Sequence, residues 1–258
     1  MNLDDTATQL LYTTVPIWAT DPNGNTISGT GFIFTYQKDD EMNIPVVVTN
    51  KHVVEGASSG LIAVVRGANS QPSKNERITI ELDGDLLKSK IHPKLDIAIF
   101  PFGPIVNELN SRGTAIFYKS ITKDILPSPK VASELSAIED VTFIGYPSGL
   151  YDRKNNTPVI RRGITASPFW NDFEGEPIFL IDAGVYPGSS GSPVFIYNRG
   201  SYPTPTGIGI GNRVIFLGVL AESIIRTEPD AARTYIGLGR VIKGDQVMAF
   251  IEEFAMSV

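Results

Sequence analysis

The six residues Gly188-Ser189-Ser190-Gly191-Ser192-Pro193 lie between two apolar runs, at residues 177–185 and 194–197. A serine flanked by glycines in a tight turn can hold its hydroxyl clear of the backbone while neighbouring N–H groups converge on one point. Acyl transfer needs this geometry, because negative charge builds up on a carbonyl oxygen, and losing one donor aimed at that oxygen costs about 3–4 kcal/mol. Taken alone, the hexapeptide fits an ordinary hairpin loop about equally well.

Acyl transfer at a serine also needs a general base, because the hydroxyl is a weak nucleophile at neutral pH. The whole chain has two histidines, His52 and His92. His52 follows a segment at residues 46–51 that begins with β-branched residues, so its imidazole is expected at the end of a buried strand, facing a cleft. Asp96 begins another apolar run, where burying a carboxylate is costly without a partner such as a histidine N–H. His92 precedes a proline and is interpreted as an ordinary loop residue.

Three segments of the chain resemble those of the trypsin-like (chymotrypsin-fold) serine proteases in their order and approximate spacing. The matching segments are Thr49-Asn50-Lys51-His52-Val53-Val54, Leu95-Asp96-Ile97-Ala98 and the serine turn. Two further segments, Gly29-Thr30-Gly31-Phe32 before the histidine and Ile181-Asp182-Ala183 before the serine, look most like the bacterial HtrA-type branch. The resemblance covers nearly the whole chain.

The resemblance implies an all-β fold of two six-stranded antiparallel β-barrels (chymotrypsin-like) with a C-terminal α-helix. Short β-rich runs separated by turn residues agree with such barrels. Residues 1–101 are expected to form the N-terminal barrel, residues 102–139 the connection, and residues 140–258 the second barrel with its helix, together one peptidase unit. Apolar residues at helical spacing within residues 245–254 predict that helix. The PDZ domain of the HtrA-type branch is not expected in this chain.

The resemblance also implies a role for each matching residue. Ser190 would be the nucleophile, His52 the general base and acid, and Asp96 the group that fixes the imidazole tautomer and stabilises the imidazolium. The backbone N–H groups of Gly188 and Ser190 would form the oxyanion hole. An imidazole pKa of about 6.5 suits a group that takes and returns a proton near neutral pH.

Two positions depart from the family pattern. Vertebrate digestive members carry an aspartate before the nucleophile, which pairs with a newly cut N-terminus, whereas this chain has Ser189. We therefore expect activity without N-terminal cleavage. Ser192 stands where the family commonly has glycine, which adds a side chain next to the nucleophile turn.

The resemblance places the primary substrate pocket at Gly184, six residues before the nucleophile, and along the strand around Ala221 and Glu222. Gly184 carries no charge, which argues against a preference for Lys or Arg. Glu222 would reverse this if it pointed inward, but charges at strand edges are normal, and we interpret it as an exposed carboxylate. An uncharged or small-to-medium apolar side chain is therefore expected at the cleaved position.

The composition excludes several other classes of protein. The chain has 28 acidic and 22 basic residues, a balance that argues against a nucleic-acid partner, because duplex binding depends largely on phosphate neutralisation. No apolar run approaches the ~18 residues of a membrane span, so no membrane partner is expected. Two histidines and no cysteine leave no convincing metal site, and no cofactor is expected. The lack of cysteine and of a secretory signal at the acidic N-terminus predicts a cytoplasmic protein.

Two functions follow from these observations. The first is a serine endopeptidase that cleaves protein or peptide substrates through a Ser-His-Asp triad and an acyl-enzyme intermediate. The alternative is a catalytically silent trypsin-fold protein that acts as a binding or scaffold module. Degenerate members usually lose a triad residue, and here all three positions are filled, which favours the enzyme. Without a zymogen device, its activity would need another restraint, such as narrow specificity or a regulatory protein partner.

Overall fold

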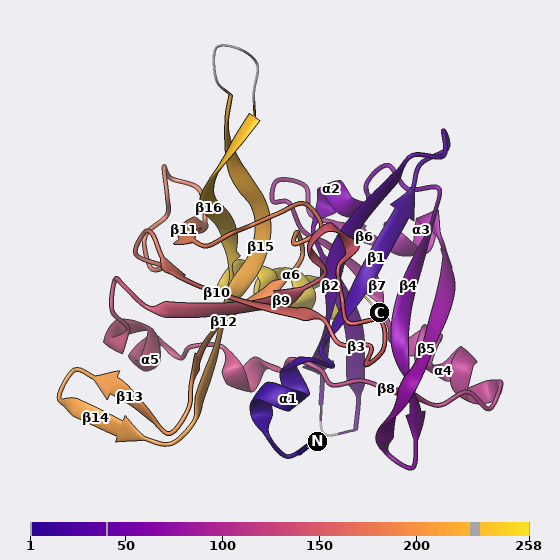
Figure 1. The fold of residues 1–258 in the computed structure, drawn as a ribbon, viewed down its shortest axis with the longest axis horizontal. Coiled ribbons are helices and arrows are strands. Elements are labelled where there is room, and N and C mark those ends of the chain that lie inside the picture. Colours follow the sequence, from indigo (N-terminus) through magenta and orange to yellow (C-terminus); the bar gives the residue numbers. More distant parts are fainter. Residues whose placement is uncertain (1, 40, 228–232, 258) are drawn as a thin grey trace.

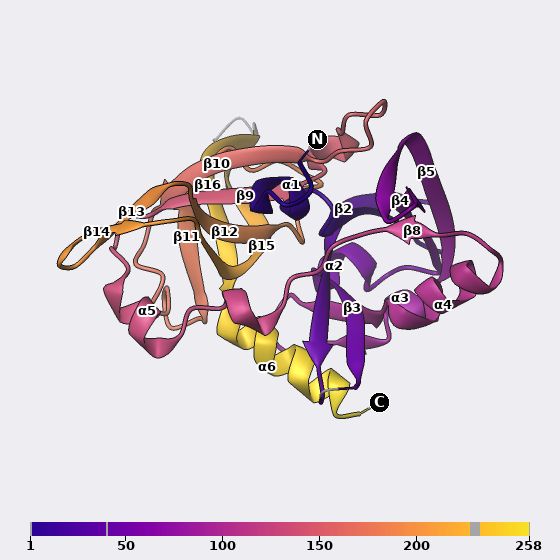
Figure 2. The same cartoon turned by 90° about the horizontal axis from the view of Figure 1, so that it is seen from below.

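The computed structural model describes residues 2–39, 41–227 and 233–257, and consists of two β-structures that lie side by side (Figures 1 and 2). The first eight strands form the N-terminal one, and most of the later strands form the C-terminal one. No helix in the described ranges combines the length and the apolar character that crossing a membrane requires.

The N-terminal half is an open, curled sheet of eight strands. They are β1 (Thr14–Thr20), β2 (Thr26–Gln37), β3 (Asn43–Thr49), β4 (Ser59–Ala68), β5 (Gln71–Asp83), β6 (Lys90–Ile91), β7 (Ala98–Pro101) and β8 (Ile116–Phe117). Their order in the sheet is β5-β4-β1-β2-β3-β7-β6, with β8 added beside β4.

The prediction of a closed six-stranded barrel in this half is wrong, because the two edge strands of the described sheet, β5 and β6, do not pair. After β5 the chain turns directly into helix α3 (Gly84–Leu87), whose first turn is capped by the Asp83 carboxylate accepting from the Asp85 N–H. Strand β6 is then only two residues long, too short to close the sheet onto β5.

The C-terminal half contains the closed six-stranded barrel that was predicted, with strands in the order β10-β11-β16-β15-β12-β9. Its strands are β9 (Asp140–Gly145), β10 (Val159–Thr165), β11 (Ile178–Asp182), β12 (Pro193–Asn198), β15 (Arg213–Thr227) and β16 (Arg233–Lys243). A separate hairpin of β13 (Ser201–Thr204) and β14 (Gly207–Ile210) projects from it (Figure 1).

Helices connect and cover these sheets. Besides α3 they are α1 (Thr6–Leu10), α2 (Lys51–Val54), α4 (Gly103–Ser111), α5 (Pro129–Glu134) and α6 (Gly244–Ala255), with short 3₁₀ turns at Lys123–Ile125 and Pro147–Gly149. The predicted C-terminal helix is confirmed as α6, which reaches from the barrel towards β3 of the open sheet (Figure 2).

A shared hydrophobic core joins the two halves. It contains Phe32 of β2, Phe195 of β12, Phe216 of β15 and Phe250 of α6. The ring centroids of Phe32 and Phe216 are 5.5 Å apart, and those of Phe195 and Phe216 are 5.9 Å apart. Full burial of such a side chain is worth about 1.5–3 kcal/mol. Because the core is common to both halves, strand ends from one half keep a fixed position relative to the other.

Candidate active site

His52 lies where strand β3 ends and the short helix α2 begins. The last four residues of β3 are buried, and they anchor this end of the sheet. Close packing against β2 depends on two glycines: a Cβ on Gly29 would lie 2.6 Å from Cγ1 of Val53, and one on Gly31 would lie 2.6 Å from Cγ1 of Val47. The glycines at positions 29 and 31 therefore let β2 support the elements that carry His52.

Asp96 contacts His52 through both carboxylate oxygens. Its Oδ2 lies 2.7 Å from His52 Nδ1, and its Oδ1 accepts a 2.9 Å hydrogen bond from the His52 backbone N–H. The buried Asn50 donates from Nδ2 to the Asp96 carbonyl at 2.7 Å, which ties the segment of Asp96 to the end of β3. The structure thus brings two of the three predicted triad residues into contact.

This pairing sets the protonation behaviour of the imidazole. Burial of the ring by itself would lower the pKa of His52, but the hydrogen bond and charge of Asp96, together with the charge of Glu222, raise that pKa above its ordinary value. Asp96 accepts the Nδ1 proton, which leaves Nε2 of the neutral ring as the acceptor. The His52 side chain is 46% exposed, so a substrate can reach it.

The serine turn has a backbone conformation that favours glycine at two positions. Gly188 and Gly191 have φ values of +86° and +88°, in the left-handed region. A Cβ on Gly188 would lie 2.7 Å from the Tyr146 carbonyl oxygen, and one on Gly191 would overlap the carbonyl oxygen of Thr30. Both positions are therefore closed to larger residues on steric grounds as well.

The peptide groups of this turn leave the two predicted oxyanion donors available. Within the described part of the chain, the N–H groups of Gly188 and Ser190 make no hydrogen bond. The carbonyl of Pro187, directly before them, accepts instead from the Ser148 N–H at 2.5 Å. Backbone donors arranged in this way can stabilise negative charge on a substrate carbonyl oxygen.

Thr30 of β2 connects the serine turn to the N-terminal half, a role that sequence reasoning missed. Its N–H donates to the Ser190 carbonyl at 2.8 Å, and its hydroxyl donates to the Gly188 carbonyl at 2.9 Å. The same hydroxyl accepts from the Tyr146 N–H at 3.0 Å, and the Thr30 carbonyl accepts from the Thr49 hydroxyl at 2.8 Å. The sequence signal was the Gly29-Thr30-Gly31-Phe32 motif, which marks the family without revealing this contact.

Ser190 is half-buried and lies close to the end of β3. A Cβ on Gly191 would lie 2.8 Å from Oγ1 of Thr49, three residues before His52. The hydrogen bonds found in the described ranges join His52 to Asp96 but do not join His52 to the Ser190 hydroxyl. Catalytic hydrogen bonds of free enzymes are often long and tighten only when substrate binds. The arrangement therefore suits a nucleophile whose contact with its base forms on binding.

The two serines that depart from the family pattern are both buried. Ser189 is 1% exposed and Ser192 is fully buried. A Cβ on Gly145 of β9 would overlap the Ser192 hydroxyl, so this side chain fills space that Gly145 leaves open. The extra side chain at position 192 is thus accommodated without displacing the turn.

The predicted pocket residues lie in three different environments. Ala221 is buried, whereas the Glu222 side chain is 59% exposed and pairs with Arg240 of the adjacent strand at 3.6 Å. Gly184 faces a guanidinium group, because a Cβ at this position would overlap Nη2 of Arg161. Arg161 did not emerge from the sequence, since it lies 23 residues before Gly184 and no motif links the two.

The second histidine has a different environment. Nδ1 of His92 accepts hydrogen bonds from the N–H groups of Lys94 and Leu95, at 3.1 and 2.8 Å, and its ring packs edge-on against Phe250. Burial lowers the pKa of His92 below its ordinary value. These contacts suit a structural residue. In the described ranges, no three His, Asp or Glu residues cluster in a way that would hold a metal ion.

Three solved structures are similar to the chain. A scabies mite inactivated protease paralogue aligns with a TM-score of 0.53 and 15% identity, over 98% of this chain and 99% of that one. An M. tuberculosis protease in its active form aligns with a TM-score of 0.48 and 17% identity, over 95% of this chain and 82% of that one. A catalytically inactive tobacco etch virus protease, in complex with substrate, aligns with a TM-score of 0.49 and 11% identity, over 93% of this chain and 81% of that one. At these identities the likeness concerns the fold alone.

No curated protein sequence matches the chain. The model of the trypsin-like peptidase domain, in contrast, matches residues 29–201, which is more than half of the chain and includes the segments of His52, Asp96 and Ser190. The chain therefore belongs to the trypsin-like peptidase domain family.

Proposed function

We propose that this chain is a serine endopeptidase that cleaves peptide bonds through a triad of Ser190, His52 and Asp96. The observation that carries the proposal is the double contact of the Asp96 carboxylate with His52. Oδ2 lies 2.7 Å from the ring Nδ1, and Oδ1 accepts a 2.9 Å hydrogen bond from the backbone N–H. This double contact fixes the ring and its tautomer, as a general base requires. The motifs around Gly29 and Ile181 favour the HtrA-type branch, and the lack of cysteine favours a cytoplasmic location.

The first half of the reaction forms an ester. A peptide carbonyl enters with its oxygen towards the Gly188 and Ser190 N–H groups, and Ser190 Oγ attacks the carbonyl carbon while His52 Nε2 takes its proton. The charge of Asp96 stabilises the imidazolium, and the two N–H groups stabilise the oxyanion. His52 then gives its proton to the leaving nitrogen, the C–N bond breaks, and the acyl group remains on Ser190.

The second half repeats these steps with water as the nucleophile. His52 takes a proton from water as the water oxygen attacks the ester carbonyl, and the same backbone donors stabilise the oxyanion. Collapse of the intermediate breaks the bond to Ser190 Oγ, which recovers its proton from His52. The peptide is released as a carboxylic acid, which loses its remaining proton to the solvent, and the enzyme returns to its starting state.

Labelling with a fluorophosphonate probe, which reacts with activated serines, tests this proposal. We expect the native chain to be labelled, and the label to be lost in Ser190→Ala and in His52→Ala. Ser201→Ala is the matched control, because Ser201 is exposed on the β13–β14 hairpin and should leave labelling unchanged. A native chain that resists the probe would favour the silent binding module, and labelling that persists in Ser190→Ala would exclude Ser190 as the nucleophile.

A further inference from the structure

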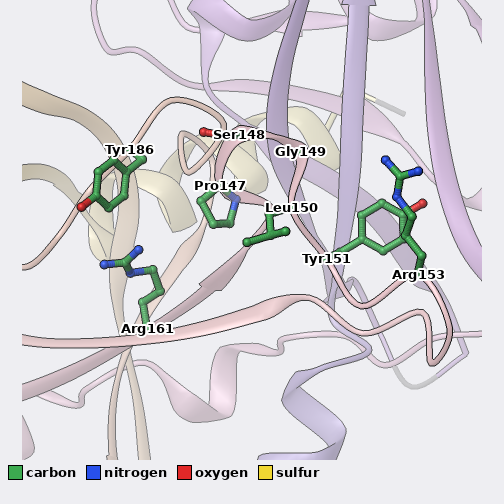
Figure 3. A pocket seen from close by; sticks show the side chains of 8 residues that line it. All are labelled: Pro147, Ser148, Gly149, Leu150, Tyr151, Arg153, Arg161 and Tyr186. Atoms are coloured by element: carbon green, nitrogen blue, oxygen red, sulfur yellow. The ribbon is translucent and has the colours of Figure 1, made fainter.

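A pocket of about 490 Å³ opens beside the serine turn. It is lined by Pro147, Ser148, Gly149, Leu150, Tyr151, Arg153, Arg161 and Tyr186 (Figure 3). The hydrogen bond from the Ser148 N–H to the Pro187 carbonyl joins this lining directly to the residue before the first oxyanion donor. A side chain held in the pocket would therefore lie next to the reacting carbonyl.

The lining is basic. Two of its eight residues are arginines and none is acidic. Arg161 and Tyr186 lie together at one end of the pocket, and Tyr151 and Arg153 at the other (Figure 3). The Arg161 guanidinium stacks over the Tyr186 ring at 5.0 Å from its centroid, and that of Arg153 lies 5.8 Å from the Tyr151 ring. Stacking on an aromatic face orients a guanidinium without neutralising it.

Arg161 differs from its neighbour on the same strand. Arg162 is 71% exposed and pairs with Asp140 at 2.7 Å. Arg161 is half-buried, and among the side chains that the structure describes it has no carboxylate within ion-pair distance. Its guanidinium instead occupies the space where a side chain at Gly184 would begin. A half-buried guanidinium that has an aromatic partner but no carboxylate partner in the described ranges favours a ligand that brings a negative charge.

We infer that Arg161 makes the primary specificity pocket basic, so that the enzyme selects substrates with Asp or Glu at the cleaved position. The inference rests on the proposed peptidase function and replaces the expectation of an uncharged side chain. A substrate carboxylate can accept two parallel hydrogen bonds from one guanidinium, which fixes its orientation as well as its charge. A side chain at position 184 would overlap the Arg161 guanidinium, so Gly184 leaves free the space that this group occupies.

Glu222 does not oppose this selection. Its side chain is largely exposed and is paired with Arg240, and its charge acts on His52. It therefore affects the substrate region beside His52, whereas Arg161 acts at Gly184.

Four peptides that differ only at the cleaved position, as Glu, Gln, Leu or Lys, provide the test. We expect the native chain to have a kcat/KM for the Glu peptide at least about tenfold above that for the Gln peptide, the size expected of one hydrogen bond to a charged group. Arg161→Gln should bring this ratio close to one, and Arg161→Lys should restore part of it. Arg162→Gln, which removes a neighbouring positive charge outside the pocket, should leave the ratio unchanged.

Binding separates failure of this inference from failure of the proposed function. Product peptides ending in Glu or Gln are titrated into the Ser190→Ala chain, with and without Arg161→Gln. About tenfold tighter binding of the Glu peptide, lost with Arg161→Gln, would support the basic pocket whether or not the native chain cleaves. Equal binding of the two peptides, or an active enzyme that prefers Gln, Leu or Lys, would overturn it while leaving the peptidase intact.

Discussion

Thr30 connects strand β2 to the serine turn through a hydroxyl that is fully buried. Thr30→Val keeps the shape of the side chain but removes its bonds to the Gly188 carbonyl and the Tyr146 N–H. We expect the free energy of unfolding to fall by about 1–3 kcal/mol, because two buried polar groups lose their partner. We also expect kcat to fall roughly tenfold with a smaller change in KM, since the oxyanion donors lose their alignment.

The matched control for this substitution is Thr30→Ser, which keeps the hydroxyl and should retain most of kcat. Peptide hydrolysis and urea unfolding measure the two effects separately. A folded Thr30→Val enzyme with native kcat would show that the backbone bond from the Thr30 N–H to the Ser190 carbonyl is sufficient to hold the turn.

His52 determines the acidic limit of activity. Burial would lower its pKa, but Asp96 and Glu222 raise it overall, so the imidazolium persists to higher pH than in a free imidazole. The general base must be neutral, and kcat/KM should therefore decline as the pH falls through this raised pKa. In Asp96→Asn we expect the His52 pKa to drop and activity to be low at every pH. Glu222→Gln should lower the pKa by less, because it acts through charge alone.

The direct measurement is an NMR titration of the His52 ring, with the pH profile of hydrolysis beside it. An unchanged titration midpoint in Asp96→Asn would mean that the contact between Asp96 and Nδ1 does not persist in solution.

Helix α6 carries much of the packing between the two halves. Phe250 is 2% exposed and lies in the core that also contains Phe32 and Phe216. Phe250→Ala should lower the free energy of unfolding by about 3–5 kcal/mol, since it removes a large side chain and leaves a cavity. Met256→Ala is the control. Met256 is 75% exposed and follows the last residue of the helix, so its loss should change the free energy of unfolding by less than about 0.5 kcal/mol. Chemical denaturation followed by circular dichroism compares them, and equal losses would contradict this role of α6.

Local sequence patterns predicted much of the fold, but they did not predict whether the N-terminal sheet closes into a barrel. Hydrophobic periodicity identified the C-terminal helix, and its buried face is the one expected from the spacing of Val247, Phe250, Ile251 and Phe254. The N-terminal half was expected to close because the family does, yet closure depends on pairing between β5 and β6, which periodicity within a strand does not encode. Strand β6 follows α3 closely in the chain and is only two residues long.

The same limit applies to the candidate site. The contact between His52 and Asp96 was predictable, because His52 follows one recognisable apolar run and Asp96 begins another. The contacts of Thr30 with the serine turn and of Arg161 with Gly184 were not, because they join segments that only the tertiary fold brings together. A glycine at position 184 was visible in the sequence, but the charge that fills its space was not.

The two halves divide the proposed chemistry between them. The open sheet supplies His52, Asp96 and Thr30, and the barrel supplies Ser190 with its flanking donors. Alignment therefore depends on the core they share and on the bonds of Thr30 to the serine turn. This division explains why a buried hydroxyl that does not itself contact the substrate is expected to affect kcat.

We expect the site to assemble without N-terminal processing. Ser189 is neutral and 1% exposed, so position 189 offers no carboxylate to attract a newly formed ammonium group. The Pro187 carbonyl is already held by the Ser148 N–H, and the Gly188 and Ser190 N–H groups are without acceptors in the described ranges. We therefore expect these two donors to bind a substrate carbonyl without prior N-terminal cleavage. Intact-mass spectrometry after fluorophosphonate labelling should find the probe on protein that retains Met1, at the rate of trimmed protein, whereas a label confined to trimmed species would require an activation step that this turn does not provide.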